Sequence, residues 1–587
     1  MPKRRLLLSR QVNVSMKTDL RETAIAFCVL LLFGLALGFP LLSKGFPVNG
    51  HDFWAHTTWG GHFAEQFWNG ELYPRWLMNH NEGLGSPTFF FYPPLPFWLT
   101  ALLSPLFPDE SAPVSALAWV STGMLVLSGW FTYLWLRDSV PARAAVLAAA
   151  VYQVAPYHLL IDLYQRAAFA EFCAMTWFPL ILFAAHRLSQ RRQQYFLLLA
   201  LATAFLTLTH LLSLLMFGPI VPAYAALLAS PGHRLRAIAL TVMAMGVGLG
   251  LSGAYLIPAL TLQPSIGMHR LWEGHGHYRQ HLYDWERVLV WGQHIPFLLL
   301  LMLSIASSIV MAILLYLLAR PPAASAHEVQ PSGARAQPIH FWMLLVLVVG
   351  FMLTLPSDFV WQILKPLQRI QFPWRQASLL TVALAALVAQ AEANVISDMS
   401  LPRRLLVLPI AVIVSSWLTL TTLHGVEILR QTPKPELNRL AHDAWEYKPR
   451  WVQGDDFQRA VKHARVADGR IPKARLSTEG KISVERWRPR DIRLVIESST
   501  DAVLTVHQFF FPGWRALIDG KTPVQVQPSQ PFGLVTLPLP AGTHAVELRL
   551  RMTPNERNGW LLTGLSAVGW LLCLMWVVRR PRRAQGA

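Results

Sequence analysis

The chain has 587 residues, of which 53% are hydrophobic and only 14% are charged. An average soluble domain carries about 25% charged residues, so the composition excludes an ordinary soluble protein. A formal charge of +18 suggests nucleic-acid binding in a soluble chain, but no such motif is present here. Much of the positive charge lies in short loops between apolar runs, as in membrane proteins. The sequence predicts a polytopic membrane protein that binds no nucleic acid.

The N-terminal segment is basic, with Lys3, Arg4, Arg5, Arg10, Lys17 and Arg21. Because positively charged loops remain in the cytoplasm, this end is predicted to be cytoplasmic. The apolar run that follows lacks a small-residue cleavage site before Pro40, so we expect an uncleaved first span and not a signal peptide. The three cysteines all lie in apolar runs and indicate neither a disulfide framework nor a zinc site.

Alternating the sides of the basic loops predicts about 12 membrane spans with both termini in the cytoplasm. Four prolines interrupt the apolar segment FFFYPPLPFWLTALLSPLF (89–107), so we expect it to lie along the outer membrane interface without crossing. No inverted repeat of the kind found in many transporters is seen. The expected spans are about 22–44, 113–136, 142–157, 168–187, 195–209, 211–229, 236–262, 296–319, 339–356, 376–397, 404–424 and 559–578.

The polar stretch 425–558 is expected to form a second, extracytoplasmic domain. It begins with a helical segment, PELNRLAHDAWEYKPRW, and continues with alternating apolar patterns such as IRLVI and HAVELRLRM. Turn signals at Asp519-Gly520 and Pro540-Ala541-Gly542 separate these patterns, which indicates a small β-sandwich. The predicted organisation is a mainly α-helical membrane domain (1–424) with a long outer loop (45–112), the α/β domain (425–558), and a last span with a basic tail (559–587).

Ionisable residues gather in three predicted outer segments, where they are functional candidates. The first segment, 45–88, holds His51, Asp52, His56 and Arg75, and the second, YHLLIDLYQRAAFAE (157–171), holds Asp162, Arg166 and Glu171. The third, 365–375, holds Lys365, Arg369 and Arg375. Cations on the outside run against the positive-inside rule, so they need an anionic partner, and a lipid phosphate is the obvious one. The three segments together indicate a site for a lipid-linked anionic substrate.

Several motifs in this order resemble the GT-C superfamily of integral membrane glycosyltransferases. They also resemble the bacterial 6-pyruvoyl-tetrahydropterin-synthase-related membrane proteins and their YfhO-like relatives, although no pterin-enzyme signature is present. The resemblance covers nearly the whole chain, and it depends on the order of the motifs because none is specific alone. The motifs are Asp52, YPRW (73–76), GLGSPTFFFYPPL (83–95), DLYQRAAFAE (162–171), THLLS (209–213), QFPWR (371–375) and FFPGWRALIDG (510–520).

The resemblance implies a GT-C-like fold for residues 1–424 and transfer of a sugar from a polyprenyl-phosphate-linked donor. The acceptor, a glycan, lipid or protein, would be modified on the outer face of a bacterial cytoplasmic membrane. Asp52 is the expected catalytic base, and Asp162 or Glu171 would orient the acceptor or hold a metal. The expected substrate-binding residues are His51, His56, Arg75, Arg166, His210, Lys365, Arg369 and Arg375.

The cofactor is left open, with a divalent metal ion as one option. The candidate ligands are Asp52, Asp162, His275 and His277, but the histidines of HRLWEGHGHYRQH (269–281) fit a loop that covers the substrate better than a metal site. Ordinary structural roles are open too. Asp52 precedes a helix and suits an N-cap, Arg166 suits an ion pair with Asp162, and His210 suits a buried hydrogen bond.

Two rival functions also remain open. A flippase or transporter of lipid-linked sugars would move its substrate across the bilayer without forming a new glycosidic bond. A non-catalytic component of envelope polysaccharide assembly would use the β-domain for binding and would tolerate changes at Asp52 and Arg375. In every case membrane lipids are the expected surroundings.

Overall fold

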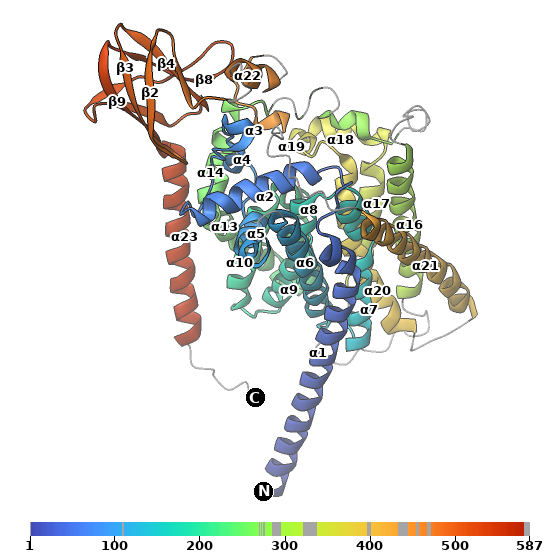
Figure 1. Cartoon of the computed structure of the whole chain (residues 1–587). Helices are drawn as coiled ribbons and strands as arrows, with labels where there is room; N and C mark the ends of the chain where they lie inside the picture. Colours follow the sequence, from blue (N-terminus) through green and yellow to red (C-terminus); the bar gives the residue numbers. More distant parts are fainter. Residues whose placement is uncertain are drawn as a thin grey trace.

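The computed structural model describes residues 2–108, 111–268, 271, 273, 276–283, 295–320, 337–395, 401–431, 444–453, 457–465 and 471–579. It consists of a bundle of long apolar helices and a smaller region of β-strands that lies beyond one end of the bundle (Figure 1). The last helix leads from the strands back along the bundle (Figure 1). The expected combination of a mainly helical membrane part with a β-rich region near the C-terminus is confirmed.

Within the described residues, ten helical segments are long and apolar enough to cross a membrane. Several of them consist of two shorter helices that follow each other directly. The segments are Leu20–Lys44, Ala112–Leu136, Ala142–Gln165, Phe169–Ser189, Leu211–Leu228, Pro231–Leu251, Pro296–Ala319, Pro373–Asn394, Leu405–Arg430 and Pro554–Arg579.

The helices that build the bundle carry the labels of Figure 1. They are α1 (Pro2–Lys44), α6 (Ala112–Leu136), α7 (Ala142–Val154), η2 (Tyr157–Gln165), α8 (Phe169–Ala174), α9 (Trp177–Ser189), α10 (Tyr195–Thr209), α11 (Leu211–Phe217), α12 (Ile220–Leu228), α13 (Arg234–Leu251), α14 (Gly253–Thr261), α16 (Ile295–Ala319), α17 (Ile339–Met352), α20 (Ala377–Val395), α21 (Leu401–Arg430) and α23 (Pro554–Arg579).

Two of the twelve expected spans correspond to helices that are shorter than the ~20 residues needed to cross a bilayer. These are α10 with 15 residues and α17 with 14 residues. The interrupted segment 89–107 forms no long helix. It is divided into α4 (Thr88–Phe91) and α5 (Leu95–Leu103), because Pro93 and Pro94 lack the N–H that a continuous helix requires.

The remaining helices, most of them short, lie between these elements in the sequence. They are α2 (Phe53–Trp68), α3 (His80–Gly83), η1 (Ser104–Leu106), η3 (Pro231–His233), η4 (Gln263–Ser265), η7 (Tyr278–His281), η9 (Leu355–Ser357), α18 (Asp358–Ile363), α19 (Lys365–Gln368), η10 (Pro373–Gln376), η11 (Trp445–Tyr447) and α22 (Phe457–Ala464). The expected helix PELNRLAHDAWEYKPRW lies largely outside the described residues.

The strands form two antiparallel sheets, one with the order β1-β4-β8-β7 and one with the order β2-β3-β9-β5-β6. Alternate side chains of β3 and β9 are buried, as expected for sheets with one face on a core. The strands are β1 (Ala474–Leu476), β2 (Gly480–Arg488), β3 (Asp491–Ser498), β4 (Ala502–Phe509), β5 (Trp514–Ile518), β6 (Thr522–Val524), β7 (Gln527–Pro528), β8 (Leu534–Leu539) and β9 (Gly542–Leu550).

Both predicted turns connect strands in the way their sequences suggest. Asp519 and Gly520 have φ angles of +52° and +67°, as a type I′ turn requires, and they join β5 to β6. The Pro540-Ala541-Gly542 corner leads from β8 in one sheet to β9 in the other. The corner therefore carries the chain between the two layers.

Trp76 attaches the β-strand region to the loop that follows α2. Its buried indole Nε1–H donates to Gln508 Oε1 on β4 at 2.8 Å, and its ring packs edge to face on Trp514 at 6.1 Å. Gln508 Nε2 in turn donates to Gly83 O at 2.5 Å. The backbone N–H of the next residue on β4 donates to Leu84 O at 2.6 Å. The motif GLGSP thus binds β4 through its backbone carbonyl groups.

A substitution at Gly85, within the GLGSP motif, tests how much the attachment of β4 stabilises the protein. Its φ is +83°, and an added Cβ would lie 2.5 Å from the Trp76 ring. We expect Gly85→Ala to lower the free energy of unfolding by about 2–4 kcal/mol, from the positive φ and from overpacking together. Thermal unfolding of the purified protein in detergent measures this change.

Gly83→Ala is the matched control, because Gly83 has a φ of +91° but open space around an added Cβ. It should lose only the conformational part, about 1–2 kcal/mol. Equal destabilisation by the two variants would show that contact with Trp76 contributes nothing.

Candidate functional site

A π-helical turn positions the charged side chains of DLYQRAAFAE. Residues Tyr157–Gln165 form this π-helix, a form that appears mainly as short segments and often at functional sites. Ala167 then adopts a φ of +54°, and the backbone N–H of Ala168 donates to Asp162 O at 2.8 Å. Glu171, in the first turn of α8, thereby lies beside the π-helical turn that carries Asp162 and Arg166.

Glu171 is the centre of this cluster and is only 3% exposed. Its Oε1 accepts a hydrogen bond from the Tyr157 hydroxyl at 2.7 Å, and its Oε2 accepts one from Arg166 Nη1 at 3.1 Å. Arg375 Nε forms an ion pair with the same Oε2 at 3.0 Å. A single carboxylate therefore joins the second and third predicted segments.

Asp162 binds the same Arg166 Nη1 atom as Glu171 and is completely buried. Its Oδ1 accepts a hydrogen bond from Arg166 Nη1 at 2.6 Å. This is the ion pair between Arg166 and Asp162 that the sequence analysis left open as a structural role. Its Oδ2 is buried without a hydrogen-bond partner in the described residues. Because an orphaned buried carboxylate oxygen is costly, it marks a position where a donor from a ligand would be stabilised.

The stretch NGHDFWAH packs against the same turn. The backbone N–H of Asp52 donates to Arg166 O at 2.9 Å. Gly50 approaches so closely that an added Cβ would lie 2.4 Å from the Ala167 Cβ. Asp52 occupies the N-cap position of α2, but its side chain makes no capping hydrogen bond there. Its half-buried carboxylate interacts electrostatically with His56 and Asp162.

His56 is a buried bridge between the first and second segments. One ring nitrogen, Nδ1, lies 2.9 Å from Ala167 O, and the other, Nε2, lies 2.9 Å from the Tyr92 hydroxyl. Burial lowers the pKa of His56 below its usual value, and the nearby Asp52 only partly opposes this. The imidazole is therefore neutral near pH 7, and it fixes the loop in place.

His51 and His210 border the cluster. The exposed His51 ring packs edge to face on Phe297 at 4.7 Å, and Phe297 packs on Trp374 at 6.3 Å. His210, between α10 and α11, bonds through Nδ1 to Ser213 Oγ at 2.8 Å and interacts electrostatically with Glu171. This is the buried hydrogen bond that the sequence left open as an alternative.

The third segment contains one largely buried cation, Arg375, and two exposed cations, Lys365 and Arg369. Arg375 is held by Glu171, by Ile370 O at 3.0 Å from Nη1, and by the Phe372 ring at 5.0 Å. Its anionic partner is therefore a side chain of the protein. Lys365 and Arg369 are exposed on and next to α19, and neither forms an ion pair with another described residue.

Arg75 is not part of the cluster and lines a cavity next to the β-strand region. It is buried, its Nη1 is 3.0 Å from Glu556 Oε1, and its Nη2 donates to Ala254 O at 2.8 Å. Of the weak metal candidates, His277 caps the short helix η7 by accepting from the Arg279 N–H at 3.2 Å. His275 lies outside the described residues.

A resident metal ion does not fit between the two buried carboxylates. Arg166 fills the position between Asp162 and Glu171 and satisfies one oxygen of each. Among the residues whose positions are described, no three His, Cys, Asp or Glu side chains gather in a way that would hold a metal.

The cluster also contains two tyrosines that sequence analysis did not identify as candidates. Tyr157 donates to Glu171, and Tyr92 contacts His56. Tyr157 stands five residues before Asp162. Two side chains at this spacing lie on the same face of a π-helix but not of an α-helix. Tyr92 lies in FFFYPPL, where its neighbours suggest membrane packing. Neither position gives a clear signal in the sequence.

The fold and the site define a polytopic membrane protein with a buried ionic cluster where three distant segments meet. A family model described as the 6-pyruvoyl-tetrahydropterin synthase related domain, a membrane protein, matches residues 89–423, more than half of the chain. The protein belongs to this membrane protein family. The matched region contains the cluster from Tyr157 to Arg375 but neither Asp52 nor the β-strands. The chain matches no curated protein.

Glu171→Gln tests whether the cluster depends on this one carboxylate. The substitution leaves Arg166 and Arg375 without their shared charge, so we expect a loss of about 3–5 kcal/mol in the free energy of unfolding. Glu485→Gln is the control, because Glu485 pairs with Arg493 at 2.9 Å with 47% of its side chain exposed, and such pairs contribute about 0–1 kcal/mol. Similar melting temperatures for both variants would contradict a central role of Glu171.

Proposed function

We propose that this protein is a glycosyltransferase that moves a sugar from a polyprenyl-phosphate-linked donor to an acceptor at the membrane surface. The observation that carries the proposal is the convergence of Asp52, Asp162 and Arg375 from three distant segments. Buried charge at membrane depth is costly, so a chain that gathers it in one place has a functional reason. The acceptor is a glycan, lipid or protein.

In the proposed reaction, an acceptor hydroxyl attacks the anomeric carbon of the donor sugar while the bond to the lipid phosphate breaks. Asp52 takes the hydroxyl proton, because its half-buried carboxylate is not used to cap α2. Asp162 Oδ2, which has no partner in the described part of the chain, accepts a hydrogen bond from the acceptor and orients it. Arg166, Glu171 and Tyr157 hold Asp162 and its surroundings in place.

The leaving lipid phosphate carries negative charge, which the exposed cations Lys365 and Arg369 would stabilise. Arg375 acts differently from the other two, because Glu171 already neutralises it. It connects the phosphate-binding segment to the acidic cluster. The site thus divides into an acidic side that handles the acceptor and a basic side that handles the donor.

A second candidate is a non-catalytic component of envelope polysaccharide assembly. The observation in its favour is that Arg166 and Arg375 are paired with carboxylates inside the protein. A self-contained ion cluster can serve to fix the packing of the helices alone. The two candidates differ in what happens when Asp52 is changed.

Asp52→Asn should abolish sugar transfer, because the amide has the same shape but takes no proton. We expect at least a thousandfold loss of turnover, with expression and melting temperature unchanged. The assay is transfer of radiolabelled sugar from polyprenyl-phosphate donors to envelope acceptors in membranes from a deletion strain that expresses the variant.

Asp519→Asn is the matched control, because Asp519 is an exposed aspartate of the β-strand region that pairs with His544. It should retain full activity. Full transfer by Asp52→Asn would remove Asp52 from the mechanism and favour the non-catalytic alternative.

A further inference from the structure

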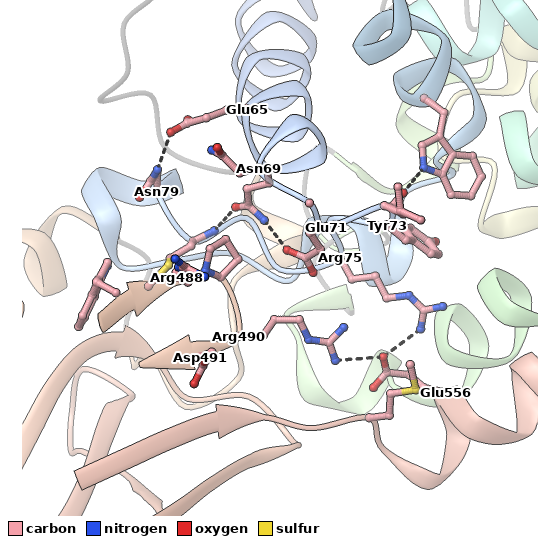
Figure 2. Close-up of a pocket in the computed structure, with 18 of the residues that line it drawn as sticks. Glu65, Asn69, Glu71, Tyr73, Arg75, Asn79, Arg488, Arg490, Asp491 and Glu556 are labelled. Carbon is pink, nitrogen blue, oxygen red and sulfur yellow. Dashed lines mark hydrogen bonds and ion pairs between the residues drawn. The ribbon is translucent and has the colours of Figure 1, made fainter. Parts of the chain in front are cut away.

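A cavity lies where the β-strand region meets the bundle. Its volume is about 1030 Å³, at the upper end of the range for small-molecule sites. The end of α2, the loop after it, α5, the β2–β3 hairpin and the start of α23 all contribute to its lining (Figure 2). We call it the junction cavity. It is separate from the ionic cluster around Glu171, since none of that cluster's residues line it.

Aromatic side chains line the junction cavity from several elements. They are Tyr73, Trp98, Trp487 and Trp560. The polar atoms of two of them are already engaged, since Trp98 Nε1 donates to Leu72 O at 2.8 Å and the Tyr73 hydroxyl donates to Phe89 O at 3.2 Å. Trp560 is 44% exposed. What Tyr73 and Trp98 offer to a ligand is therefore ring surface and not a hydrogen-bonding atom.

Charged groups of both signs lie between the rings, and the acidic groups outnumber the basic ones by one. Arg75 and Arg490 converge on the same Glu556 oxygen at 3.0 and 3.5 Å, as Figure 2 shows. The lining carries four carboxylates (Glu65, Glu71, Asp491 and Glu556) and three guanidinium groups (Arg75, Arg488 and Arg490). An anion such as phosphate gains no net attraction here. A neutral ligand that both donates and accepts hydrogen bonds fits better.

Glu71 provides an unfilled hydrogen-bonding position in this lining. Its Oε2 accepts from Gln66 Nε2 at 2.9 Å (Figure 2), while its Oε1 is buried without a partner among the described residues. Burial raises the pKa of Glu71 to about 7, although Arg490, Gln66 and Arg75 oppose the rise. A hydroxyl group from a ligand would satisfy Oε1.

We propose that the junction cavity binds a neutral saccharide, whose C–H faces pack on the aromatic rings and whose hydroxyls bond to Glu71 and its neighbours. Aromatic surface with a few fixed polar groups is the combination such a ligand requires. The structure also assigns a role to Arg75, which packs over the Tyr73 ring at 4.3 Å and anchors α23 through Glu556. If the protein is the proposed transferase, this saccharide is the glycan part of its acceptor; this identification rests on the proposed function.

Binding of trisaccharides to the purified full-length protein tests this proposal. The probes are trisaccharides of glucose, mannose, galactose and N-acetylglucosamine, with inorganic phosphate as a separate arm. The protein is held in lipid nanodiscs free of sugar-based detergent, and saturation-transfer NMR with tryptophan fluorescence reports binding. At least one trisaccharide should bind with a millimolar or lower Kd, and phosphate should not compete with it.

Trp560→Ala and Glu71→Ala should each weaken this binding at least tenfold. Their controls are Trp68→Ala, an exposed tryptophan outside the cavity, and Glu485→Gln, and both should bind like the parent protein. Trisaccharide binding should also weaken between pH 8 and pH 6, because Glu71 is ionised above about pH 7 and protonated below it. Glu71→Ala should lose this pH dependence.

The outcome is independent of catalysis, because Asp52→Asn should bind the trisaccharide normally. If no trisaccharide binds the parent protein, or if phosphate displaces it, the saccharide proposal is overturned while the transferase proposal stands. If binding is lost in the cavity variants but Asp52→Asn transfers sugar normally, the catalytic role proposed for Asp52 fails and the saccharide site stands.

Discussion

The carboxylate of Glu171 is the interaction on which the arrangement of the bundle depends. It receives a phenol and two guanidinium groups from Tyr157, Arg166 and Arg375. Charges at this depth are stable only when they are paired and hydrogen-bonded, so these side chains must meet. Their meeting fixes the π-helical turn, the start of α8 and the segment before α20 relative to one another.

The loop that begins with NGHDFWAH depends on the turn that this cluster fixes. Two hydrogen bonds connect the loop to carbonyl groups of Arg166 and Ala167, and Gly50 allows the close approach. The carbonyl groups are available because Ala167 leaves the helix with a positive φ. Strain of this kind persists only where the surroundings impose it, and it is common at functional sites.

The β-strand region is connected to the same loop farther along the chain. Trp76 and Gln508 join the motif GLGSP to β4, and Arg75 joins the loop to α23 through Glu556. The junction cavity lies at this connection. One segment, which includes α2, thus leads from the ionic cluster to the cavity, so the proposed acceptor site and the proposed base lie on a continuous piece of chain.

The sequence by itself determined the class of protein, most of the spans, the proline-broken segment 89–107 and the β-turns. These depend on local hydrophobicity, on proline, and on residues that tolerate positive φ, all of which are visible along the chain. It also identified Asp52, Asp162, Glu171 and Arg375 as candidates. Only the tertiary structure decided that Glu171 is the partner of Arg375, that Tyr157 and Tyr92 belong to the cluster, and that Arg75 lines the junction cavity. Such pairings join residues up to hundreds of positions apart, and nothing in a local pattern specifies them.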